Sequence, residues 1–162
     1  MTWFKSLTLA GRELLPIVQG GMGVGISAHR LAGAVASQNA MGTIASIDLR
    51  HHHPDLLEKT ERCHDRDLID SANLEALHRE IRAALDTAQG RGLVAVNVMK
   101  AVRGHPALVR QACESGAQAI VMGAGLPLDL PEMTADFPKV ALVPILSEAR
   151  GVAAVPGSAP RS

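Results

Sequence analysis

Several short segments of this sequence are apolar at consecutive positions rather than at alternate ones. Leu93-Val-Ala-Val-Asn-Val98 is the clearest, and residues 118–122 and 139–145 are similarly aliphatic. A strand that is buried on both faces has this pattern, which is typical of a parallel sheet covered by helices. Segments with helical spacing lie between the apolar runs, at residues 28–37, 71–89 and 105–115. The alternation predicts an α/β fold with a parallel sheet.

The composition agrees with one aliphatic domain. The chain has 162 residues, 47% of them hydrophobic, with no Tyr, one Trp and two Phe. Its sixteen basic and sixteen acidic residues cancel. Because there is no basic excess, we expect no binding to nucleic acid or to a membrane surface, and a small molecule is the favoured partner.

The cysteines and the first residues indicate a cellular compartment. Cys63 and Cys113 are far apart and belong to no CxxC pair, so we expect neither a disulfide nor a cysteine-rich zinc site. Cys113 falls within an expected helix and is interpreted as a buried small residue. Residues 1–15 contain charges and no long apolar run, which is unlike a signal peptide or a membrane span. A soluble, cytoplasmic protein is expected.

Five strands are expected, near residues 16–19, 41–45, 93–98, 118–122 and 139–145. Ser71 is the expected cap of the helix over 71–89, in which Leu74, Leu77 and Ile81 recur at helical spacing. Two architectures fit the repeat: a doubly wound open sheet, or part of an eight-stranded barrel, which usually takes about 250 residues.

A glycine-rich turn follows the first expected strand. Gly20, Gly21, Gly23 and Gly25 remove side chains from this turn, so a flat or anionic ligand can approach its backbone N–H groups and the next helix N-terminus. A tight connection without a ligand is equally compatible with these glycines. Ser27 and Ser46, near strand ends, are candidates either for a ligand contact or for a cap or turn.

A histidine-rich stretch invites a metal interpretation. His51, His52 and His53 lie near Asp55 and His64, and imidazole and carboxylate groups both bind zinc. Consecutive loop residues cannot all converge on one tetrahedral ion. A solvated loop is therefore favoured, and we expect no metal.

Four blocks of the chain, in order, resemble the nitronate monooxygenases, formerly called 2-nitropropane dioxygenases. Flavin-dependent enoyl-[acyl-carrier-protein] reductases are relatives of that family. The blocks are Pro16-Ile-Val-Gln-Gly-Gly-Met-Gly23 with residues 31–37 and 41–44, Val94-Ala-Val-Asn-Val-Met99, residues 119–127, and Val140-Ala-Leu-Val-Pro-Ile-Leu146. The resemblance runs from about residue 15 to about residue 155.

The resemblance implies an α/β fold that is a partial (β/α)8 TIM barrel, about its first five β/α units. It implies FMN as cofactor, bound at the carboxyl ends of the strands, and oxidation of alkyl nitronates with O2. Gly20, Gly21 and Met22 would line the flavin ring, and Asn97 and Gly123 would complete the cofactor site. Ala124 and Gly125 would form the loop beside the substrate.

Asn97 also stands out by itself, because a buried amide needs hydrogen-bond partners. A ligand edge would satisfy it, and so would a neighbouring carbonyl. Met22 and Met99 are compatible either with contacts to a flavin ring or with filling gaps in the core.

The sequence departs from the family pattern in its second half. The family's catalytic histidine lies in a Gly-Gly-His block after the sixth strand, and glycine loops after the seventh and eighth hold the flavin phosphate. No His follows His105 here. The resemblance therefore predicts the amino-terminal part of such a barrel over residues 1–155, an unstructured tail over 156–162, no catalytic residue, and no activity for this chain alone.

Two alternatives remain open. One keeps the flavin and changes the reaction to enoyl reduction with a nicotinamide donor. The other is a non-catalytic barrel fragment, which binds flavin weakly or self-associates through unpaired strand edges.

Overall fold

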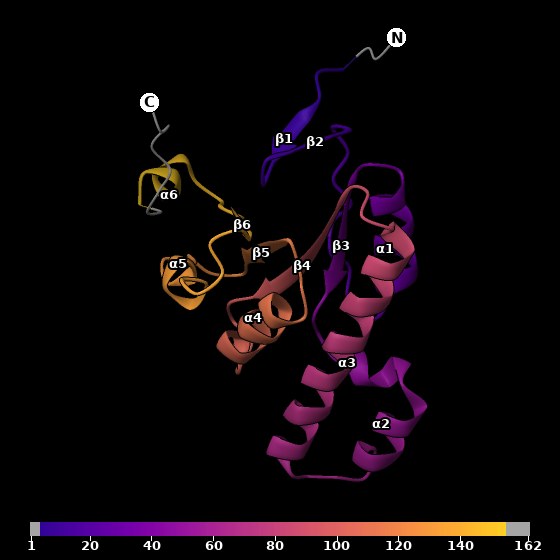
Figure 1. The fold of residues 1–162 in the computed structure, drawn as a ribbon. Helices are drawn as coiled ribbons and strands as arrows, with labels where there is room; N and C mark the ends of the chain where they lie inside the picture. The colour runs from indigo at the N-terminus through magenta and orange to yellow at the C-terminus, as the bar shows by residue number, and fades with distance from the viewer. Residues whose placement is uncertain (1–3, 155–162) are drawn as a thin grey trace.

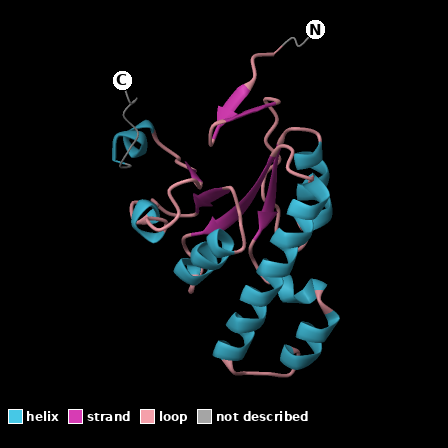
Figure 2. Ribbon diagram, viewed as in Figure 1, coloured by secondary structure: helices cyan, strands magenta, loops and turns pink. Residues whose placement is uncertain are grey.

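The computed structural model describes residues 4–154 and contains two sheets (Figures 1 and 2). A hairpin is made of β1 (Leu7–Leu9) and β2 (Arg12–Leu14), and a four-stranded sheet has the order β3 (Met41–Ala45), β4 (Leu93–Met99), β5 (Ala119–Gly123) and β6 (Ala141–Pro144). The helices are α1 (His29–Ser37), the 3-10 helix η1 (Leu49–His52), α2 (Pro54–Thr60), α3 (Arg66–Ala88), α4 (His105–Glu114), α5 (Leu130–Met133) and α6 (Ala149–Ala154). The tail expected over 156–162 lies outside the described residues.

The parallel α/β sheet expected from the apolar runs is confirmed. All three strand pairs of the larger sheet are parallel, and its strands follow the order of the chain. Asn97 pairs in register with Ala45 on one side and with Val121 on the other. The end of β4 is therefore flanked by the ends of β3 and β5.

The two faces of the sheet have different cover. One face packs Ile44, Val96 and Ile120 against α1, α3 and α4 in the main core. The other face presents the small residues Ala95 and Ala119, and its amino-terminal end lies under apolar residues of the hairpin. In Figure 1 this hairpin stands at the top of the view, while α1 and α3 run side by side.

The first expected strand, residues 16–19, forms only one bridge, between Val18 and Met41. The amide of Gln19 donates to Met41 O at 2.9 Å, and the amide of Met41 donates to Ile17 O at 3.1 Å. Pro16 cannot donate to a ladder, and the glycines begin at Gly20. Too few residues lie between these two limits for a regular strand.

The hairpin of β1 and β2 was not expected from the sequence. Ala10 and Gly11 both have positive φ, at 50° and 70°, as a two-residue hairpin turn of the primed type requires. The strands are only three residues each, too short to show a clear alternation. Gly11 was the one local feature of the sequence that indicated a turn here.

The expected start of the long helix at Ser71 was wrong. Helix α3 begins at Arg66, because the Asp65 carboxylate accepts from the amides of Asp67 at 3.0 Å and Leu68 at 3.4 Å. The polar stretch before Ser71 is thus largely helical, as η1, α2 and the first turn of α3. Within residues 4–154, every helix is too short or too polar to pass through a lipid bilayer.

Candidate functional site

A cleft of about 320 Å³ opens where β3 and β4 end. The glycine-rich turn contributes Gly21 and Gly23 to its lining, and the strands and the loop after β3 contribute Asn97 and Ser46. Carboxyl ends of parallel strands lie at one edge of a sheet, where α/β proteins bind their ligands. We call this the β3–β4 cleft.

Hydrogen bonds of Gln19 and Ser27, at the two ends of the glycine-rich turn, hold the turn together and attach it to β3. Gln19 Oε1 accepts from the amide of Thr43 at 2.9 Å, and Gln19 Nε2 donates to Ser27 Oγ at 2.9 Å. Ser27 Oγ also accepts from the amide of Met22 at 2.9 Å. Ser27 is fully buried. Ser27 was a candidate either for a ligand contact or for a cap or turn, and these hydrogen bonds support its role in the turn.

Three of the four glycines are closely packed, and a Cβ on Gly25, which has a φ of 71°, would overlap the ring of His52. A Cβ on Gly21 would lie 2.5 Å from Asn97 Cβ, and a Cβ on Gly23 would lie 2.6 Å from Ile47 Cγ2. A Cβ on Gly20 would meet nothing within 4 Å. The turn thus lies directly on the ends of β3 and β4, and this contact alone requires glycine at Gly21 and Gly23.

Asn97 is half-buried and faces the cleft. Its Nδ2 donates to Val121 O of the neighbouring strand at 3.5 Å, at the long limit of a hydrogen bond. Its backbone carbonyl accepts from the amide of Ser46 at 3.1 Å. A neighbouring carbonyl therefore does accept from the Asn97 side chain, as one of the two alternatives required. This hydrogen bond is long enough that the edge of a ligand can compete for the side-chain amide.

The N-terminus of α1 holds a carboxylate of the chain itself. The amide of His29, the first residue of α1, donates to Glu80 Oε2 at 2.6 Å. The sequence left open whether a flat or anionic ligand approaches this helix N-terminus, and in the structure Glu80 bonds to its first amide. Glu80 was missed by sequence reasoning, although a charged residue between Leu77 and Ile81 on the apolar stripe of a helix is an unusual position for a charge.

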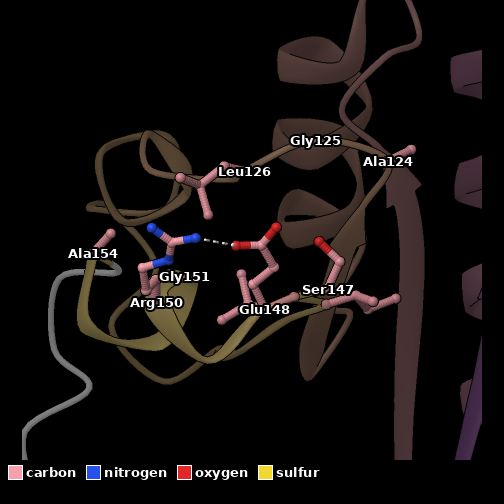
Figure 3. Close-up of a pocket in the computed structure, with 10 residues that line it drawn as sticks. Ala124, Gly125, Leu126, Ser147, Glu148, Arg150, Gly151 and Ala154 are labelled. Carbon is pink, nitrogen blue, oxygen red and sulfur yellow. Dashed lines mark ion pairs between the residues drawn. The ribbon is translucent and has the colours of Figure 1, made fainter.

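A second cleft, of about 620 Å³, lies beyond the ends of β5 and β6 (Figure 3). Ala124 and Gly125 line it together with Ile145 and residues of α6, including Arg150. Arg150 is 3.6 Å from the Glu148 carboxylate, the ion pair drawn in Figure 3.

The expected site residues are therefore divided. Gly21 and Asn97 line the β3–β4 cleft, while Ala124 and Gly125 line the second one. Gly20, Met22 and Gly123 are not among the residues lining these two clefts: Gly20 and Met22 are exposed, and Gly123 is buried against Ile145.

Three charged or titratable side chains that the sequence did not single out lie together beyond the end of β4. Lys100 forms an ion pair with Asp129, and His105 Nε2 lies 3.9 Å from Asp129 Oδ2. The hydrogen bond from Lys100 lowers the pKa of Asp129 below its usual value. The pair joins the end of β4 to the residue before α5, so the ammonium group is already neutralised.

The histidine-rich stretch does not converge on one point. Among residues 4–154, no three His, Cys, Asp or Glu side chains are arranged to hold a metal ion. His51 and His52 are exposed, and His53 Nε2 lies 3.1 Å from Glu80 Oε1. Cys113 is buried, as expected, and burial raises the pKa of its thiol to about 11.

In comparisons with known proteins, the chain matches no family model and no curated protein. The resemblance to nitronate monooxygenases therefore rests on the four sequence blocks. Two of those blocks supply Gly21 and Asn97 to one cleft.

Proposed function

We propose that this chain is a nitronate monooxygenase-like, FMN-dependent oxidoreductase whose flavin ring lies in the β3–β4 cleft. The observation that carries the proposal is the meeting of Gly21 and Asn97, which are far apart in the sequence, at the same cleft. The substrates would be an alkyl nitronate and O2. When bound, FMN would supply the redox chemistry, and the protein would position the ring and exclude water.

The lining of the cleft suits a flat heteroaromatic ring. Its polar side chains are the Asn97 amide and the Ser46 hydroxyl, and Val24, Val102 and Leu108 supply apolar walls. Its volume of about 320 Å³ is near the lower end of the roughly 300–1,000 Å³ usual for ligand pockets. None of the ten described lining residues is charged. The cleft therefore fits the ring of FMN, and the phosphate would need another part of the protein.

We also propose that the sheet is the first part of a (β/α)8 barrel. Its strands follow chain order without reversal, and α1, α3 and α4 all cover the same face. A doubly wound sheet would reverse its strand order and carry helices on both faces. A barrel keeps its helices outside and packs side chains within.

The same lining argues that this chain binds its ligand without converting it. The ten described lining residues include no group able to take up a proton near neutral pH. Their role is to bind and orient the ring, so we propose no turnover by this chain alone. A cytoplasmic location is part of the proposal, and the two free cysteines favour it.

Flavin-dependent enoyl reduction is the second candidate, because it would use the same ring site. Two assays separate the candidates: nitronate-dependent O2 uptake, and NAD(P)H oxidation in the presence of an enoyl thioester. We expect neither rate to exceed that of free FMN. A rate above that background would identify the reaction and contradict the proposed lack of turnover.

Flavin binding is tested by equilibrium dialysis of the purified chain against riboflavin and against FMN. We expect similar affinities, because the cleft holds the ring and not the phosphate. Asn97→Leu should weaken both about tenfold through loss of a hydrogen-bonding group. Ser147→Ala, in the second cleft, is the matched control and should change neither. Absence of binding to both flavins would refute the proposal.

A further inference from the structure

A buried carboxylate joins three elements behind the glycine-rich turn. Glu80, on α3, is only 2% exposed. Its Oε2 accepts from the amide of His29 at 2.6 Å and lies 2.8 Å from His29 Nδ1, and its Oε1 lies 3.1 Å from Nε2 of His53, the residue before α2. A carboxylate is buried at a large cost unless it is hydrogen-bonded. The hydrogen bonds with His29 make the burial of Glu80 tolerable, and the His53 ring lies at ion-pair distance without forming a hydrogen bond.

Glu80 supplies the cap that α1 lacks in its own sequence. Ala28 stands at the N-cap position of α1 and has no side-chain acceptor to offer. The carboxylate of a different helix takes that role, and a negative charge is favourable at a helix N-terminus. Glu80 therefore determines where α1 begins, which is also where the glycine-rich turn ends.

The turn is attached to other elements at three points. At its start, Gln19 is bonded to the Thr43 amide of β3. At its end, the Ser27 carbonyl accepts from the amide of Ala45 in β3 at 2.9 Å, and His29 is bonded to Glu80 of α3. Gly21, between the start and the end, lies against Asn97 and lines the β3–β4 cleft. Because glycines allow many backbone conformations, a segment rich in them keeps one shape only while both ends are held.

We propose that Glu80 is a positioning residue for the β3–β4 cleft. It is not among the residues that line the cleft, and it acts through α1 by keeping the glycine-rich turn in the arrangement that receives a ligand. Loss of the carboxylate removes the attachment of the turn to α3, so the end of the turn is held by Ser27 alone. The ligand must then restrict the added motion of the turn on binding. The inference rests on the proposed function only in taking the flavin ring as that ligand.

Two variants and one control test the proposal. Glu80→Ala removes every contact, and Glu80→Gln keeps an oxygen for the His29 amide but loses the charge. Glu75→Gln is the control, because Glu75 is exposed on the same helix and pairs with Arg79 at 2.8 Å. Amide hydrogen exchange over residues 20–29 reports how well ordered the glycine-rich turn is, and dialysis against riboflavin reports ligand binding in the β3–β4 cleft.

We expect Glu80→Ala to raise exchange over residues 20–29 about tenfold and to weaken riboflavin binding about tenfold. Glu80→Gln should give intermediate changes of about threefold, and Glu75→Gln should change neither. If Glu80→Ala does not fold, Glu80→Gln decides by the same two measurements.

Unchanged exchange over residues 20–29 would overturn the proposal. A rise spread evenly over β4 and α4 would also overturn it, because Glu80 would then support only global stability. If the unaltered chain binds no riboflavin, the proposed function fails by itself, and the exchange pattern still decides whether Glu80 holds the turn.

Discussion

Gly20 and Gly21 are neighbours in the sequence, yet only Gly21 lies against another side chain. The environment of Gly20 is open, whereas Gly21 lies directly on Asn97. At this scale, glycine has a packing reason at one position and none at the next. The two positions therefore form a matched pair for mutation.

We predict that Gly21→Ala destabilises the chain by about 1–3 kcal/mol. The new Cβ would lie 2.5 Å from Asn97 Cβ, so either the backbone of the turn or the end of β4 must move. Gly20→Ala should be neutral or stabilise by up to about 1 kcal/mol, through loss of freedom in the unfolded chain. Urea denaturation of both variants measures the difference. Equal effects would show that the close contact does not exist in solution.

The two cysteines should differ in reactivity. Burial raises the pKa of the Cys113 thiol to about 11, so little thiolate exists at pH 8, while Cys63 is only half-buried. We predict that iodoacetamide labels Cys63 first in the folded chain. Labelling of Cys113 should rise as the pH approaches 11 or when urea unfolds the protein. Mass spectrometry of Cys63→Ser and Cys113→Ser variants assigns each rate, and equal rates at pH 8 would contradict the prediction.

At the scale of elements, the start of α3 shows two signals in competition. Ser71 precedes an apolar repeat and has the sequence features of a cap, but Asp65 lies ahead of it and its carboxylate accepts two amides. The residues between them carry enough polar side chains to form one exposed turn of helix. The earlier cap prevails because nothing between the two positions breaks the helix.

We predict that Asp65→Ala lowers stability by about 1 kcal/mol, the usual effect of removing an N-cap. Ser71→Ala should be neutral or slightly stabilising, because position 71 is exposed inside the helix and Ala is the better helix former there. Thermal unfolding monitored by circular dichroism compares the two. Asp65→Ser should recover most of the loss, and a larger effect at Ser71 would place the cap where the sequence suggested.

At the scale of the whole molecule, the sheet has two edges with exposed apolar residues. Ile17 and Val18, beside β3, are 55% and 53% exposed, and Ile145, after β6, is 54% exposed. Within residues 4–154, β6 pairs with β5 alone. Unpaired edges of this kind promote association. The net charge of zero opposes it little.

We predict that the 162-residue chain self-associates through these edges. Two copies related by a twofold axis along the strands would bring the β6 edge of each beside the Ile17 edge of the other, with all strands parallel. Light scattering over a range of concentrations measures the mass. Ile17→Lys and Ile145→Lys should each shift the chain toward monomer, whereas Leu68→Lys, on an exposed site of α3, should not. A constant monomeric mass would contradict the prediction.

The sequence by itself determined the parallel sheet and one edge of the candidate site. Consecutive aliphatic residues indicate a strand buried on both faces, because successive side chains of a strand point to opposite faces of the sheet. Once the strands are parallel, Asn97 and the residues after β3 must meet at one edge. That Gly21 and Asn97 share a cleft follows from this topology.

Tertiary structure alone decided how the glycine turn is held and how the site is divided. Glu80 and His29 are 51 residues apart, and no local pattern relates a helix cap to a carboxylate of another helix. The separation of Gly21 and Asn97 from Ala124 and Gly125 into two clefts likewise depends on where α5, α6 and the loops pack. Sequence patterns report the environment of each residue, whereas contacts between distant segments arise only when the helices pack on the sheet.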